Sequence, residues 1–145
     1  MRHHLVLRVV TKLLIPMILL FAVYVQFHGD FGPGGGFQAG VIFGSGIIVY
    51  GLIFGAVTAR RVISPTVLRV LAAGGVLLYT GVGVAGLLLG GNFLEYRVLA
   101  AQSTSGEHIG IFLIELGVGV TVASVMIGLF YAFTGYRHIA TGDER

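Results

Sequence analysis

The sequence predicts an all-α integral membrane protein with four transmembrane helices and with both termini in the cytoplasm. Of its 145 residues, 56% are hydrophobic and only 10% are charged, whereas soluble domains carry about 25% charged residues. Four apolar segments can each cross a hydrocarbon core about 30 Å thick as a helix. The segments are too long and continuous for the strands of a barrel, so helices are the structure that satisfies the backbone in lipid.

The first predicted helix covers residues 5–27 and carries Arg8 and Lys12 in its early turns. A basic start before an apolar run also resembles a signal peptide. No small-residue cleavage site follows Phe27, however, and three more apolar segments come later. We therefore expect a retained helix that anchors the N-terminus.

Lys12 is a candidate for the ion path near the cytoplasmic end of this helix. Its long side chain can reach the interface, which is the more ordinary role. Pro16 lies four residues later and cannot donate a hydrogen bond to the Lys12 carbonyl. The freed carbonyl could ligate a cation, although water or the Thr11 hydroxyl could satisfy it equally well.

A turn rich in glycine joins the first helix to the second, with the sequence Pro33-Gly34-Gly35-Gly36-Phe37-Gln38-Ala39-Gly40. Proline fixes its own φ and lacks a backbone N–H, and glycine permits positive φ and close approach of other groups. This order of residues predicts a sharp turn back into the membrane, packed against protein. His28, Asp30 and Gln38 flank the turn and could offer ligands to a cation, but such residues more often cap turns.

The remaining predicted helices cover residues 37–57, 67–90 and 109–133, and small residues line their faces. Such stripes let helix backbones approach closely in membranes. The third helix has small residues on two faces, which suggests neighbours outside this chain, although a self-contained bundle is the alternative. The glycines that we expect to pack helices are Gly44, Gly51, Gly55, Gly86, Gly90 and Gly117.

The orientation follows from the basic residues at the ends of the helices. The chain has nine Lys and Arg residues, and in a four-span arrangement only Arg97 falls on the side opposite to the termini. Because cytoplasmic loops carry the excess of basic residues, this distribution places both termini in the cytoplasm. No repeat is evident, so residues 1–145 are expected to form a single transmembrane domain.

Glu115 is the clearest candidate for ion chemistry, because it lies inside the fourth predicted helix. A carboxylate within the membrane is costly and usually faces protein or water. His108 shares its helical face nearer to the outer surface and could exchange protons with it. The competing interpretation is a structural ion pair or hydrogen bond to a neighbouring subunit.

Other kinds of site find little support. The chain has no cysteine, which excludes disulfides and Cys-ligated zinc or iron–sulfur centres. Its five histidines are scattered, so no metal site or cofactor is expected. The charge distribution suits membrane orientation better than nucleic-acid binding, and no Ser/His/Asp arrangement points to an enzyme.

Residues 33–40, together with Phe27-His28-Gly29 and Val41-Ile42-Phe43, resemble the signature of the MnhB family of multisubunit sodium/proton antiporters (Mrp or Mnh type). The later run from Gly110 to Gly119 fits the same family, and the resemblance extends from about residue 5 to about residue 133. It implies a multi-pass component of a prokaryotic cytoplasmic (inner) membrane complex that exchanges Na⁺ for H⁺. The partners would be large subunits related to those of respiratory complex I, other small subunits, and the lipid bilayer.

The resemblance leaves the role of this chain in the complex open. It could line part of the ion path, or it could be a scaffold that positions its neighbours. Relatives also occur in membrane-bound hydrogenase complexes, so an equivalent component there is an alternative. A small channel formed by several copies of this chain alone is a further alternative.

Overall fold

The computed structural model describes residues 5–29, 34–99 and 103–140, and within these residues the chain forms helices and no strand. Four stretches are long and apolar enough to cross a membrane: α1, α2, α4 and residues Gly106–Gly135 of α5. This confirms the predicted all-α class with four spans. The elements are α1 (Leu5–Phe27), α2 (Gly36–Phe54), α3 (Ala56–Val62), α4 (Pro65–Leu88), the 3-10 helix η1 (Tyr96–Leu99) and α5 (Ser103–Ala140).

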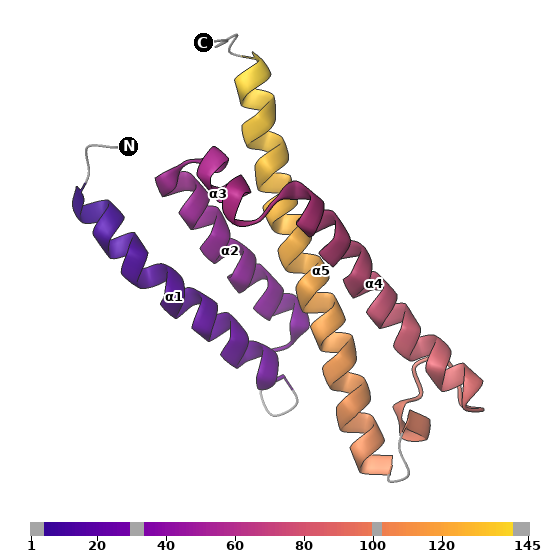
Figure 1. Ribbon diagram of the computed structural model, residues 1–145. Helices are drawn as coiled ribbons and strands as arrows, with labels where there is room; N and C mark the ends of the chain where they lie inside the picture. The colour runs from indigo at the N-terminus through magenta and orange to yellow at the C-terminus, as the bar shows by residue number, and fades with distance from the viewer. Residues whose placement is uncertain (1–4, 30–33, 100–102, 141–145) are drawn as a thin grey trace.

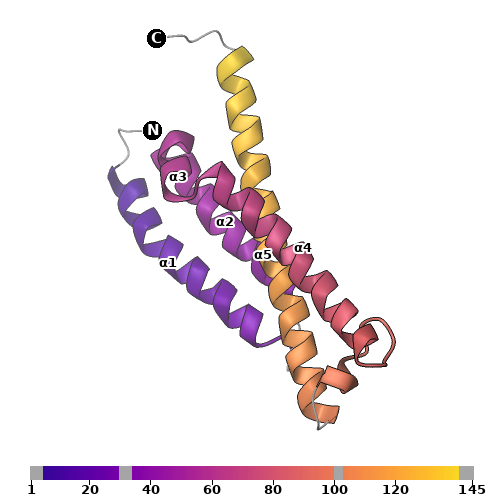
Figure 2. The ribbon, with the colours of Figure 1, turned by 45° about the vertical axis from the view of Figure 1, so that its right-hand side comes forward.

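Helix α5 organises the bundle. It packs against α2 and against α4, and α1 lies mainly along α2 (Figures 1 and 2). Helix α2 is shorter than α1, with 19 residues against 23. In Figure 1 the first turn of α2 does not reach the level at which α1 ends.

A glycine divides the second predicted helix into two. We expected one helix over residues 37–57, but α2 ends at Phe54 and the short helix α3 begins at Ala56. Gly55 between them has φ +101°, a backbone conformation that residues with a Cβ rarely adopt. The chain therefore bends at Gly55, and α3 leaves the direction of α2 (Figure 1).

The last helix extends beyond the predicted span of residues 109–133 at both ends, because α5 runs from Ser103 to Ala140. Hydrophobicity reports the part of a helix that suits lipid, and polar turns can continue the same helix in water. The third predicted span, residues 67–90, corresponds to α4. Its start is fixed by Pro65 at the first position and by the Ser64 hydroxyl, which accepts a hydrogen bond from the Val67 N–H at 3.3 Å.

Helix α3 is tied to α5 by hydrogen bonds. The Tyr131 hydroxyl donates to the Ile63 carbonyl at 3.1 Å, and the Arg60 Nη2 donates to the Tyr131 carbonyl at 2.6 Å. A buried apolar cluster lies beneath this junction, made of Ile47, Ala59, Leu68, Ile127 and Tyr131.

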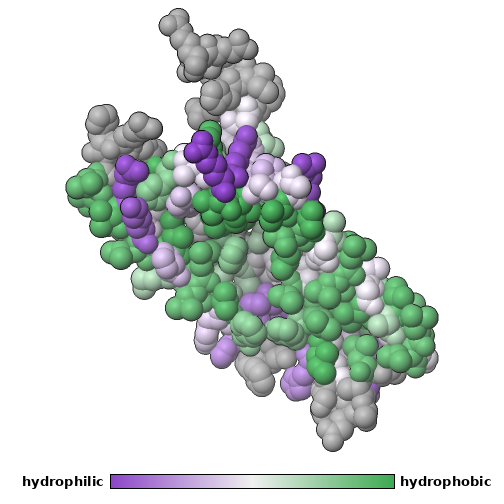
Figure 3. Space-filling model, in the orientation of Figure 1, coloured by the Kyte–Doolittle hydropathy of each residue, from purple (hydrophilic) through white to green (hydrophobic). Residues whose placement is uncertain are grey.

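The outer surface of the bundle is largely apolar. Figure 3 shows hydrophobic residues over most of the visible face, with hydrophilic residues gathered toward the end where α3 lies. Arg60 and Arg61 are in the last turn of α3. At the same end, the Arg8 guanidinium and the Lys12 ammonium lie 5.3 Å and 6.0 Å from the centre of the Phe54 ring. Basic charge is therefore concentrated at one end of the bundle, as the sequence predicted.

Candidate functional site

The glycines around the α1–α2 turn surround the Glu115 side chain of α5. A Cβ added to Gly29 would overlap the carboxylate, with Oε1 at 2.6 Å and Cδ at 2.7 Å. A Cβ added to Gly35 would lie 3.1 Å from the same Oε1. A Cβ on Gly36 would overlap the main chain of Glu115, with Cα at 2.9 Å. The backbone of the turn therefore forms a cradle around this carboxylate, which we call the glycine cradle (Gly29, Gly35 and Gly36).

The backbone conformation of the cradle requires glycine, and so does the small space that it leaves for a side chain. Gly35 has φ +151° and ψ −179°, in a region of the backbone map that is essentially restricted to glycine. The Gly35 carbonyl then accepts the hydrogen bond from the Ala39 N–H at 3.0 Å that opens α2. A side chain at Gly35 would strain the backbone, and one at Gly29 or Gly36 would displace Glu115.

One turn further along α5, the helices remain very close. A Cβ on Gly40 would lie 2.5 Å from the Gly119 carbonyl oxygen. A Cβ on Gly119 would lie 2.6 Å from the Gln26 Oε1 and 3.1 Å from the Gly36 carbonyl oxygen. The Gln26 amide of α1 thus reaches into the junction of α2 and α5, where its Nε2 is buried without an acceptor among the described residues.

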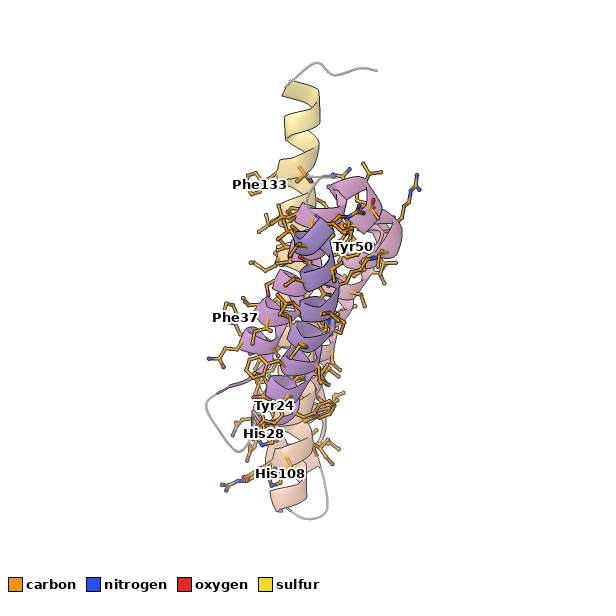
Figure 4. All side chains as sticks on the ribbon, turned by 90° about the vertical axis from the view of Figure 1, so that its left-hand side faces the viewer. Tyr24, His28, Phe37, Tyr50, His108 and Phe133 are labelled. Carbon is orange, nitrogen blue, oxygen red and sulfur yellow. The ribbon has the colours of Figure 1, made fainter. Side chains whose placement is uncertain are left out.

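The structure places Gly34, Phe37 and Gln38 of the predicted turn outside the cradle. Pro33 lies outside the described residues. Gly34 borders the Val25 side chain, which an added Cβ would approach to 3.3 Å. Phe37 and Gln38 are exposed, and in Figure 4 Phe37 lies well apart from the labelled histidines. The cradle therefore depends on backbone positions rather than on the Gln38 side chain, whereas Asp30, another proposed cation ligand, lies outside the described residues.

His108, the predicted partner of Glu115, lies at the end of the bundle beside the turn, as does His28, which was predicted to flank the turn. His108 lies on α5 and is exposed, as is His28 just after α1. Figure 4 shows both at the same end of the molecule. The His28 ring stacks on Tyr24 with centroids 4.3 Å apart, and Phe27 stacks on Phe112 of α5 at 5.6 Å. The contact of Phe27 with Phe112 holds the end of α1 against α5.

Lys12 is at the opposite end of the bundle from these residues. Its side chain is exposed and lies over Phe54 at the end of α2, which is the end remote from the turn. Helix α1 continues through Pro16. The structure therefore does not bring Lys12 together with Glu115 and His108.

The glycines predicted to pack helices fall into two groups. The first group packs closely on neighbouring helices. A Cβ added to Gly44 would lie 3.2 Å from Met126, one added to Gly51 would lie 2.5 Å from the Phe130 ring, and one added to Gly117 would lie 2.8 Å from the Gly75 carbonyl oxygen. Gly86 is covered by the loop after α4, with the Asn92 carbonyl at 3.2 Å. Gly55 and Gly90 instead end helices, with φ of +101° and +85°, because a chain reversal also needs glycine.

Two contributors to this region were absent from the candidate site residues of the sequence analysis: Gln26, and Gly29, which appeared there only within the family signature. Gln26 carried a detectable signal, since it is an amide in the largely apolar second half of α1. The position of Gly29 against Glu115 could not be anticipated, because it depends on how α5 packs against the turn. Within the part of the chain that the structure describes, no three His, Asp or Glu side chains are close enough to hold a metal ion.

Comparison with known proteins gives one family and relatives within it. Residues 6–128 match the family described as "Domain related to MnhB subunit of Na+/H+ antiporter". The chain is 34% identical over 137 residues to proteins named "Putative antiporter subunit mnhB2" from Staphylococcus aureus strains Newman and JH1. Each alignment covers 91% of this chain and 95% of the relative. The family match reaches into all four membrane-crossing stretches and covers the positions of the glycine cradle and Glu115.

Proposed function

The chain belongs to the family of domains related to the MnhB subunit of Na⁺/H⁺ antiporters, and from this membership we propose that it is a small multi-pass component of a multisubunit Na⁺/H⁺ antiporter. The proposed location is a prokaryotic cytoplasmic membrane, with the termini in the cytoplasm. The proposed partners are the other antiporter subunits. The names of the relatives refer to an antiporter, which favours this setting over a hydrogenase complex.

Within that complex, we propose that Glu115 belongs to the route of the exchanged ions. The observation that supports this role is the glycine cradle, which brings main-chain atoms against the carboxylate from Gly29 and Gly35. A carboxylate is a hard oxygen ligand of the kind that alkali and alkaline-earth cations prefer. A carboxyl group at membrane depth can hold a proton or, when ionised, attract a cation. Competition of H⁺ and Na⁺ for one carboxyl group would couple the two fluxes.

The histidines extend this proposed route toward the side of the turn. His108 and His28 are exposed at the end of the bundle where the turn lies (Figure 4). An imidazole can both accept and release a proton, which suits it to a proton relay. We propose that His108 supplies protons to Glu115, and that Lys12, at the other end of the bundle, acts as an interfacial residue.

A scaffold role is the second candidate, and the same contacts support it. Gly36 and Gly40 pack directly on the α5 backbone, as structural glycines in membrane bundles do. In that case Glu115 would stabilise the turn without titrating. The two roles predict different results for a substitution that removes the charge of Glu115 and keeps the shape of its side chain.

The experiment that separates them replaces Glu115 by Gln in the full set of antiporter subunits. Glu115→Gln keeps the volume of the side chain in the cradle, and Glu107→Gln is the matched control, because that side chain is 40% exposed on the same helix. We expect Glu115→Gln to abolish Na⁺-dependent H⁺ movement in membrane vesicles while the complex assembles normally on a native gel, and Glu107→Gln to change neither. Full exchange by assembled Glu115→Gln complexes would exclude the ion-path role. Lost assembly would support the scaffold.

A further inference from the structure

The end of α1 meets α5 on both sides of Glu115. Helix α1 lies mainly along α2 and reaches α5 chiefly near its own C-terminal end (Figure 1). The Phe27 ring contacts Phe112, three residues before Glu115. Gly29 borders the Glu115 carboxylate. Because positions three or four residues apart lie on one face of a helix, the end of α1 covers the face of α5 that carries Glu115.

Gln26 makes the contact on the other side of Glu115. Its Oε1 lies close to the Cα of Gly119, four residues after Glu115, because a Cβ added to Gly119 would be only 2.6 Å from that oxygen. The Gly36 carbonyl oxygen borders the same point on α5, 3.1 Å from the added Cβ. The side chain of Gln26 is therefore inserted between α2 and α5, one helical turn from Glu115 and three residues before Gly29.

Gln26 is an amide in surroundings that are otherwise apolar. It lines a cavity of about 250 Å³, and apart from Ser124 the described residues that line this cavity are apolar or glycine. The Gln26 Nε2 is buried and has no acceptor among the described residues. A buried donor without an acceptor destabilises a fold, and an apolar group of the same shape in its place is neutral or stabilising. Packing alone would therefore favour an apolar residue here, and the amide points to a role in function.

We propose that Gln26 is a positioning residue for the ion exchange at Glu115, an inference that rests on the function proposed above. The insertion of its side chain between α2 and α5 sets the position of Gly29 against the Glu115 carboxylate. Its amide also places a fixed dipole one helical turn from that carboxylate. In the low dielectric of the bundle, such a dipole stabilises the charges that exchange there.

The test replaces Gln26 by Met in the full set of antiporter subunits, because Met has a similar length and lacks the amide. Gln38→Met is the matched control, since Gln38 is exposed on α2. We expect Gln26→Met complexes to assemble and to have a thermal midpoint at least as high as that of the unmodified complex, because the buried donor is gone. In membrane vesicles we expect their apparent KM for Na⁺ to rise about ten-fold, the size of one lost interaction with a charged group. Gln38→Met should change neither the midpoint nor KM.

A second variant approaches the same contact from α5. The methyl group of Gly119→Ala would displace the end of the Gln26 side chain, because the nearest obstacle to it is the Gln26 Oε1. We expect Gly119→Ala to raise KM for Na⁺ as well. The rises should not add in the double variant, since both changes act on one contact.

Equal KM values for the Gln26→Met and Gln38→Met complexes would overturn the proposal. So would lost assembly or a lower midpoint of the Gln26→Met complex, which would make Gln26 a structural residue. The Glu115→Gln complex separates this inference from the function on which it rests. If Glu115→Gln abolishes exchange and Gln26→Met leaves KM unchanged, this inference alone fails. If assembled Glu115→Gln complexes exchange fully, the ion-path role fails and this inference fails with it.

Discussion

The close approach of α2 to α5 predicts that one added methyl group at Gly40 will disturb the bundle. A Cβ at Gly40 would lie 2.5 Å from the Gly119 carbonyl oxygen and 2.9 Å from the Val122 Cβ. An ordinary carbon–oxygen contact is about 3.3 Å, so the two helices must separate by roughly 0.8 Å at this point. Neither obstacle is the flexible end of a side chain, so the contact cannot be relieved by a rotamer change.

The expected change in stability caused by Gly40→Ala follows from two opposing effects. Forcing an extra methyl into a packed interior costs about 1–3 kcal/mol, and replacing glycine by alanine inside a helix gains up to about 1 kcal/mol. Gly81 on α4 provides the control, because an added Cβ there meets nothing within 4 Å. Gly40→Ala should therefore be less stable than Gly81→Ala by about 1–3 kcal/mol.

The assay is the thermal stability of the purified complex, measured as the fraction that remains monodisperse after heating, together with the amount assembled in membranes. We expect Gly40→Ala to lower the midpoint by several degrees or to reduce assembly, and Gly81→Ala to match the unmodified complex. Equal midpoints and equal assembly of the two variants would refute the packing that places Gly40 on the α5 backbone.

Three further substitutions probe the bundle away from the cradle. Ser64→Ala removes the cap of α4 and should cost about 1 kcal/mol, seen as a lower thermal midpoint that Ser64→Asp restores. Tyr131→Phe removes the hydrogen bond to the Ile63 carbonyl and should cost about 1 kcal/mol, with faster proteolysis around α3 as the readout; unchanged proteolysis would contradict this role of the Tyr131 hydroxyl. Arg97→Gln should leave the midpoint unchanged, because the side chains of this ion pair are 70% and 40% exposed. Glu107 raises the pKa of Arg97 through their hydrogen bond, so Arg97 would lose its charge only in strongly alkaline solution.

The four spans could be predicted from the sequence because hydrophobic length is a direct requirement of the bilayer. The ends of the helices were less predictable. Gly55 was counted among the packing glycines because it falls on the same stripe as Gly51, and its φ of +101° shows that it ends α2 instead. A stripe of glycines does not distinguish close packing from chain reversal, since both use the missing Cβ.

The candidate site was predictable in its parts and not in its assembly. Glu115 stood out because a carboxylate is rare at membrane depth, and the glycine turn stood out by its composition. That the turn encloses the Glu115 side chain depends on the register of α5 against α2, which Gly36 and Gly40 set through contacts far apart in sequence. The cavity beside Gln26 arises in the same way, from four helices that meet in space.

The most direct test of the proposed function is to observe protonation of Glu115 itself. Infrared difference spectra of the purified complex, recorded between Na⁺-rich and Na⁺-free buffer at constant pH, report the carboxylic acid C=O band as protons are displaced. We predict that Na⁺ lowers this band in the unmodified complex and that the change is absent from the Glu115→Gln complex. An identical Na⁺-dependent change in both complexes would show that Glu115 does not exchange protons with Na⁺.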